Sequence, residues 1–226
     1  MRLVDRLSRR GSAHAASEMA GGAAGGDQGS RWLVVGLGNP EAEYAGTRHN
    51  LGADVVRALA ARLGASFKAH KAVAQIADTF DRPGGVPLSL VIPSGYMNNS
   101  GGPVQRVAAF YKVGVDRLIV VHDEIDLPFA ALRLKRGGGT AGHNGVKDVQ
   151  RALGSPDFYR VRIGVGRPPG RQDPADFVLH RFSPKEREQI DVTCQDAADA
   201  TLVLISDGLE AAQNQYHAPR GAPNPG

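Results

Sequence analysis

Residues 32–64 read WLVVGLGNPEAEYAGTRHNLGADVVRALAARLG, and the rest of the chain is organised around them. The apolar run at 32–35, followed by Gly-Leu-Gly, predicts a buried strand that ends in a turn. The last part of the stretch carries apolar residues at helical spacing, and Gly64 is typical of a helix end. His49 and Asn50 are therefore expected between the carboxyl end of a strand and the start of a helix. Ligands bind at that edge in open α/β sheets.

The Gly-Leu-Gly sequence also invites a nicotinamide-binding interpretation. That motif needs a third glycine, and Glu41 stands in its place. Pro40 removes a backbone donor that a phosphate-binding turn would use. The plainer alternative is a tight turn that carries a solvent-exposed histidine, so the rest of the chain has to decide between them.

Length and composition fit one domain of ordinary size. The chain has 226 residues, 42% of them hydrophobic, and we expect no membrane span because no apolar run reaches roughly 18 residues. A single cysteine, Cys194, excludes an internal disulfide framework and a cysteine-rich zinc site, and it fits a reducing, cytoplasmic location. Residues 1–30 are small and polar, so we expect a disordered extension there, a domain at 31–218 and a flexible tail at 219–226.

Positive charge is concentrated in one segment. The formal net charge is +4, yet residues 130–171 contain nine basic and only two acidic residues. A basic segment on an otherwise neutral-to-acidic chain favours a polyanionic partner. A solvated basic surface without a partner would explain the charge alone equally well.

Strand and helix patterns alternate along the rest of the chain. Apolar or alternating runs predict further strands at 67–79, 88–92, 118–121, 131–136 and 159–165. Helical spacing and capping residues predict helices at 103–114, 146–153 and 183–206, with a further turn or two at 209–216. This order predicts an α/β fold: a single domain with a twisted, mixed, mostly parallel sheet flanked by helices on both faces.

The predicted strand-end loops carry polar side chains that suit hydrolysis. They are Asn39 and His49, then Asn98, then Asp123, and finally His143 with Asn144. A histidine can take a proton from water near neutral pH, and a carboxylate on its far nitrogen fixes the tautomer. Asparagine amides can donate to a developing oxyanion. Since the chain has no Gly-x-Ser-x-Gly elbow, we expect water to attack an activated acyl group such as an ester.

A metal site is the competing interpretation of His122-Asp123-Glu124-x-Asp126. Neighbouring residues on a strand point to opposite faces, so His122 and Asp123 would not readily face one ion. We therefore expect neither a metal nor another cofactor.

Five motifs in this order closely resemble bacterial-type peptidyl-tRNA hydrolases, from about Trp32 to His217. They are GLGNP at 36–40, YxxTRHNxG at 44–52, YMNxSG at 96–101, HDExDLP at 122–128 and GGGxxGHNGxKD at 137–148. The resemblance implies a monomeric, metal-free enzyme that cleaves the ester between a peptide and the 3′ ribose of tRNA, which recycles the tRNA. It also implies contact with the acceptor stem and CCA end.

The resemblance implies roles for individual residues as well. His49 would be the general base, Asp123 its orienting carboxylate, and Asn39 would hold the ester and its transition state. Residues that bind or line the peptide site would be Tyr44, Tyr96, Met97, Asn98, His143 and Asn144. Lys135 and Arg162 would bind tRNA phosphate. A non-catalytic RNA-binding protein on the same fold is the alternative.

Overall fold

The computed structural model describes residues 31–217, so the predicted N-terminal extension and C-terminal tail lie outside the described residues. Within that range, seven strands form one sheet in the order β2-β3-β4-β1-β5-β7-β6. The strands are β1 (Trp32–Gly36), β2 (Lys68–His70), β3 (Ala74–Phe80), β4 (Pro87–Pro93), β5 (Leu118–Glu124), β6 (Leu132–Arg136) and β7 (Tyr159–Gly164). The central strands β4, β1, β5 and β7 pair in parallel, while β2, β3 and β6 are joined by antiparallel pairing.

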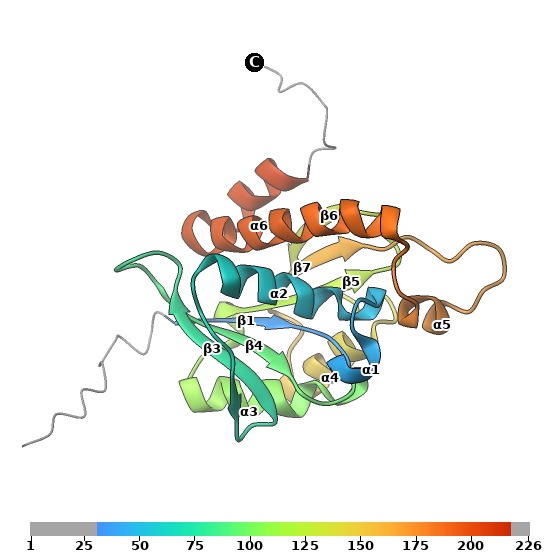
Figure 1. The fold of residues 1–226 in the computed structure, drawn as a ribbon. Helices are drawn as coiled ribbons and strands as arrows, with labels where there is room; N and C mark the ends of the chain where they lie inside the picture. Colours follow the sequence, from blue (N-terminus) through green and yellow to red (C-terminus); the bar gives the residue numbers. More distant parts are fainter. Residues whose placement is uncertain (1–30, 218–226) are drawn as a thin grey trace, which may run out of the picture.

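Helices cover both faces of this sheet (Figure 1). The α-helices are α1 (Glu41–Tyr44), α2 (Leu51–Arg62), α3 (Gly101–Tyr111), α4 (Asn144–Leu153), α5 (Pro174–Leu179) and α6 (Pro184–Tyr216). Short 3-10 turns are η1 (Arg48–Asn50), η2 (Met97–Asn99) and η3 (Val115–Arg117). α2 and α6 lie on one face, and α3 and α4 lie on the other. The predicted α/β fold, with one mixed sheet between helices, is confirmed.

The core consists of two apolar layers, one on each face of the sheet. Strand side chains alternate between them, so Val34 and Val121 pack on the side of α2 and α6, while Val35 and Val120 pack on the side of α3 and α4. β5 is buried along its whole length because it lies in the middle of the sheet under both layers. None of the helices in residues 31–217 is long and apolar enough to cross a membrane.

β5 is longer than predicted. The sequence predicts a strand that ends at Val121, whereas pairing with β7 continues to Glu124. Asp123 therefore belongs to a paired strand rather than to a loop. α3 is shorter than predicted, because Lys112 adopts a left-handed conformation (φ 55°) and ends the helix before Gly114.

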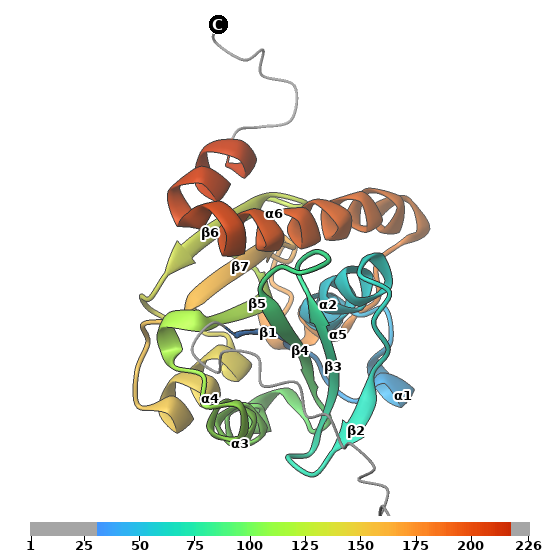
Figure 2. The same cartoon turned by 90° about the vertical axis from the view of Figure 1, so that its left-hand side faces the viewer.

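The last helix, α6, bends near its end. Ser183 and Glu186 form a capping box at its start, and Gly208 interrupts it with a φ of 88°. The final turns cross the edge strand β6 (Figure 2). There the Gln213 side chain donates to the Leu134 carbonyl (2.9 Å), and the Leu134 N–H donates to Nε2 of His217 (2.8 Å).

Candidate functional site

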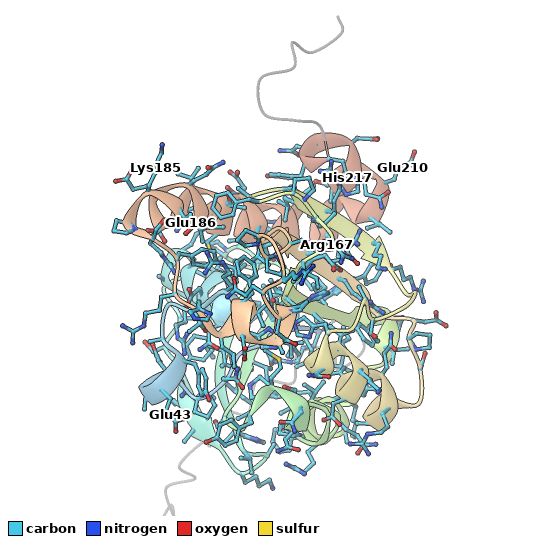
Figure 3. The ribbon with its side chains drawn as sticks, turned by 90° about the vertical axis from the view of Figure 1, so that its right-hand side faces the viewer. Glu43, Arg167, Lys185, Glu186, Glu210 and His217 are labelled. Atoms are coloured by element: carbon cyan, nitrogen blue, oxygen red, sulfur yellow. The ribbon has the colours of Figure 1, made fainter. Side chains whose placement is uncertain are left out.

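A cleft of about 540 Å³ opens at the carboxyl end of the parallel strands. Its lining includes nine of the predicted site residues: Asn39, Tyr44, His49, Tyr96, Met97, Asn98, Asp123, His143 and Asn144. α5 supplies a further wall. Figure 3 views the side of the molecule on which α5 lies, with Glu43 marking α1 and Glu186 the start of α6.

His49 and Asp123 form a buried hydrogen-bonded pair. Nδ1 of His49 lies 3.0 and 3.1 Å from the two carboxylate oxygens of Asp123, and the two residues are 9% and 2% exposed. Because a carboxylate only accepts, Nδ1 carries the proton and the lone pair is on Nε2. Burial alone would lower the pKa of His49, but the charge and hydrogen bond of Asp123 raise it above its ordinary value of 6.5.

His143 binds the same carboxylate. Its Nδ1 accepts from the N–H of Val146 at the start of α4 (3.3 Å), which leaves the proton on Nε2. Nε2 then donates to Oδ1 of Asp123 at 3.0 Å. Although burial alone would raise the pKa of Asp123, His49 and His143 hold it well below its ordinary value. Asp123 is therefore an ionised acceptor between two imidazoles.

A pair of asparagines fixes the loop after β1. The backbone N–H of Asn39 donates to Oδ1 of Asn50 (2.8 Å), and Nδ2 of Asn50 donates to the Asn39 carbonyl (3.1 Å). Oδ1 of Asn39 accepts from the N–H of Met97 (2.8 Å). The NH2 group of Asn39, which lines the cleft, has no protein partner within residues 31–217. Sequence reasoning did not assign this function to Asn50.

Two glycines allow the loops to approach each other closely. A Cβ at Gly52 would clash with the carbonyl oxygen of Val121, so only glycine lets the start of α2 approach the ends of β1 and β5. A Cβ at Gly145 would clash with Sδ of Met97, which packs beneath the first turn of α4. Met97 itself is 4% exposed, whereas the neighbouring Asn98 is exposed. The loop that carries Asn39 and the first turn of α4 thus both contact the buried Met97.

Arg48, beside His49, connects the loop that carries His49 to the wall that contains α5. Its guanidinium donates to the backbone carbonyls of His180 (3.1 Å) and Arg181 (2.9 Å) and to Glu186 (2.9 Å). It also lies over the rings of Phe177 and Phe182. Neither this connection nor α5 was predicted. The Asp173-Pro174 pair that caps α5 is a readable signal, because the Asp173 side chain accepts from the Ala175 N–H.

A metal could be considered at one place in the described part of the chain. His49, Asp123 and His143 offer ligand atoms that all lie within 4.8 Å of one another. These atoms are already hydrogen-bonded to one another, so the group needs no cation to hold it together. The HDExD sequence at 122–126, which the sequence offered as a metal site, does not bring its side chains to one point. Nδ1 of His122 is hydrogen-bonded to the Asp123 backbone carbonyl instead (2.6 Å).

The structure separates Lys135 and Arg162 from the nine cleft residues. They lie on β6 and β7, where Lys135 pairs with Arg160 and Arg133 pairs with Arg162 across the strands. Arg160 is 1% exposed and donates to the carbonyls of the glycine loop at 138–139. Arg160 therefore adds to the positive charge counted in the sequence, but its side chain is buried and stabilises the glycine loop.

Comparison with known proteins gives a consistent result. The sequence model of the family described as peptidyl-tRNA hydrolase matches residues 33–224. A peptidyl-tRNA hydrolase from Frankia casuarinae is 56% identical over 187 residues, which cover 83% of this chain and 94% of that protein. One from Mycobacterium tuberculosis is also 56% identical, over 82% of this chain and 97% of that relative. A solved peptidyl-tRNA hydrolase from Acinetobacter baumannii superposes with a TM-score of 0.79 at 34% identity, over 87% of this chain and 100% of that one.

Proposed function

Because this chain belongs to the peptidyl-tRNA hydrolase family, we propose that His49 activates the water that hydrolyses the peptidyl ester in this cleft. The observation that supports this most is the orientation of His49. Its Nδ1 is held by Asp123, so the lone pair on Nε2 is available as a base. The raised pKa keeps the imidazole basic enough to take a proton from water.

The reaction then follows from the groups in the cleft. Water attacks the ester carbonyl carbon while His49 takes its proton, and Asp123 stabilises the imidazolium that forms. The NH2 group of Asn39 donates to the oxyanion of the tetrahedral intermediate. Collapse of the intermediate breaks the bond to the ribose oxygen, which receives the proton from His49. The products are a free peptide acid and tRNA.

The remaining cleft residues suit recognition of a peptide main chain. Asn98 and Asn144 are exposed amides that can donate to carbonyls and accept from N–H groups. Tyr44 and Tyr96 stack edge to face with ring centres 6.4 Å apart, and Met97 lies beside them in the cleft. These groups bind without regard to side-chain identity, as a substrate that carries many different peptides requires.

The basic strands suit the tRNA. Lys135 and Arg162 would bind phosphates of the acceptor stem while the CCA end enters the cleft, and phosphate contacts carry no sequence information. We further infer a monomer, since one chain supplies every group named here. A cytoplasmic location is supported by the single buried cysteine, Cys194.

Release of labelled N-acetyl amino acid from N-acetyl-aminoacyl-tRNA tests the proposal, with a chelator present. We expect rapid release by the wild type and a loss of about 10²–10⁴-fold in His49→Ala. His70→Ala, on the edge strand β2, is the matched control and should keep full activity. A folded wild type that binds the tRNA without releasing the amino acid would favour the RNA-binding alternative instead.

A further inference from the structure

Four cationic side chains share one face of β6 and β7. The strand register pairs Arg133 with Arg162 and Lys135 with Arg160, and residues two apart on a strand share a face. Like charges directly opposite one another destabilise a sheet. One carboxylate lies beside this group. It is Glu124, at the end of β5, which is 6% exposed. Its Oε2 lies 3.9 Å from Nη1 of Arg162.

The cations differ in how they are held. Arg160 donates to two backbone carbonyls of the glycine loop at 138–139. Among the described residues, Glu124 is the only polar partner of the Arg162 guanidinium, whose Nε is buried without a hydrogen bond. Glu124 is therefore the one residue in the described part of the chain that can orient the Arg162 guanidinium by charge.

The electrostatic effects agree with this geometry. Burial lowers the pKa of Arg162, Glu124 opposes that effect, and Arg133 adds to it. Glu124 also opposes the lowering of the pKa of Lys135 and of Arg160. One carboxylate thus partly offsets the lowering of the pKa of three cations. The side chains of Glu124 and Arg162 are 6% and 19% exposed, so mobile ions screen the pair only weakly.

Glu124 also connects this group to the catalytic residues. It follows Asp123 directly on β5, it lines the cleft, and its Oε1 accepts from the N–H of Asp126 at 3.3 Å. The paired strands β5 and β7 carry Asp123 and Arg162 in adjacent rungs of the ladder. A carboxylate at this point can fix the distance between a phosphate held by Arg162 and an ester held beside His49.

We propose that Glu124 is a positioning residue for tRNA, which orients Arg162 so that the bound acceptor stem presents its ester to the catalytic pair. This inference rests on the proposed function, in which Arg162 binds phosphate. The direction in which RNA binding changes when the carboxylate is removed separates this role from an effect of charge alone. By charge alone, a carboxylate beside a phosphate-binding surface weakens RNA binding, so its removal would strengthen binding. By positioning, its removal weakens binding.

Glu124→Gln is the variant that separates these two effects. The amide oxygen of glutamine can still accept from the N–H of Asp126, while the charge that orients Arg162 is lost. We expect the KM for N-acetyl-aminoacyl-tRNA to rise about tenfold with kcat unchanged, and the salt dependence of kcat/KM to become shallower. Glu124→Asp, which restores the charge, should recover part of the KM.

The matched control is Asp126→Asn, which removes one nearby negative charge from an exposed residue paired with Arg167. It should leave the KM unchanged or lower it. If Glu124→Gln also leaves the KM unchanged or lowers it, the positioning role is wrong. Thermal unfolding of each variant, monitored by circular dichroism, establishes that all are folded.

Two further measurements distinguish this inference from the proposed function. N-acetyl-aminoacyl-adenosine carries the ester without the acceptor stem, so Glu124→Gln should cleave it at the wild-type rate; a loss there would place Glu124 in the chemistry and overturn the proposal. Arg162→Gln should raise the KM for the tRNA substrate, and adding Glu124→Gln to it should change nothing more. A wild-type KM in Arg162→Gln would refute the phosphate contact and this inference together, leaving ester hydrolysis by His49 intact.

Discussion

Asp123 and Arg162 lie on neighbouring parallel strands but are held in very different ways. Asp123 is 2% exposed and receives hydrogen bonds from two imidazoles, each fixed in one tautomer. Arg162 has one ion pair of 3.9 Å and a buried Nε with no partner in the described chain. The roles that we propose account for the difference, because proton transfer depends on small distances and requires groups that are fixed from several sides. Binding of a polyanion depends on charge over longer distances and tolerates more freedom.

The largest effect is expected when the hydrogen-bonded group around Asp123 is broken. Asp123→Asn should lower kcat by about 10²–10⁴-fold, because an amide can hold His49 in the wrong tautomer and cannot stabilise the imidazolium. A general base must be neutral, so activity falls as the pH drops through the pKa of His49. Asp123 raises that pKa and burial lowers it. The acid limb of kcat/KM should therefore move to lower pH in the variant; an unmoved limb would contradict the pairing.

The next largest effect concerns the amide of Asn39. Asn39→Asp keeps an oxygen for the N–H of Met97 but replaces the donor that faces the cleft with a carboxylate. We expect kcat to fall by about 10²–10³-fold, the usual cost of losing one oxyanion donor. Asn99→Asp makes the same change on η2 at an exposed residue outside the cleft and should be neutral. Equal activity of the two variants would exclude Asn39 from the transition state.

A smaller effect is expected for the basic side chains of β6 and β7. Lys135→Ala should raise the KM for the tRNA substrate about tenfold without changing kcat, and should reduce the salt slope by about one. Lys185→Ala, at the exposed start of α6 (Figure 3), is the control for charge alone. A fall in kcat instead of a rise in KM would mean that the two regions are not separable.

The smallest effect concerns a backbone contact at the outer edge of β6, where the end of α6 meets Leu134. Gln213→Ala removes the hydrogen bond to the Leu134 carbonyl and should lower the free energy of unfolding by about 1 kcal/mol. Activity should not change. Urea unfolding of this variant beside Gln215→Ala, an exposed neighbour, measures the difference. A matching midpoint in both variants would show that the contact contributes nothing to stability.

The sequence predicts the site well where the argument depends on strand ends. Carboxyl ends of parallel strands meet at one edge, so residues following three separate apolar runs were expected together, and Asn39, Met97 and Asp123 do line one cleft. The catalytic and binding roles assigned to these residues stay predictions until the variants are measured.

Contacts between distant segments could not be predicted in the same way. The hydrogen bond between His143 and Asp123 was not predicted, and only the cap of α4 fixes which nitrogen of His143 faces that carboxylate. Arg48 would count as one more charge in the sequence, whereas the fold buries it against backbone carbonyls some 130 residues away. Neither pattern has a periodic signal, because both depend on how the chain returns to the same place.

The bent end of α6 also affects how the protein can be handled. An open strand edge offers N–H and C=O groups to which another chain can add, which is a common route to aggregation. Here Gln213 and His217 occupy both backbone groups of Leu134, in the middle of edge strand β6. A truncation that removes these two residues would free that edge for pairing between copies. Truncations and fusion junctions are therefore best placed beyond His217.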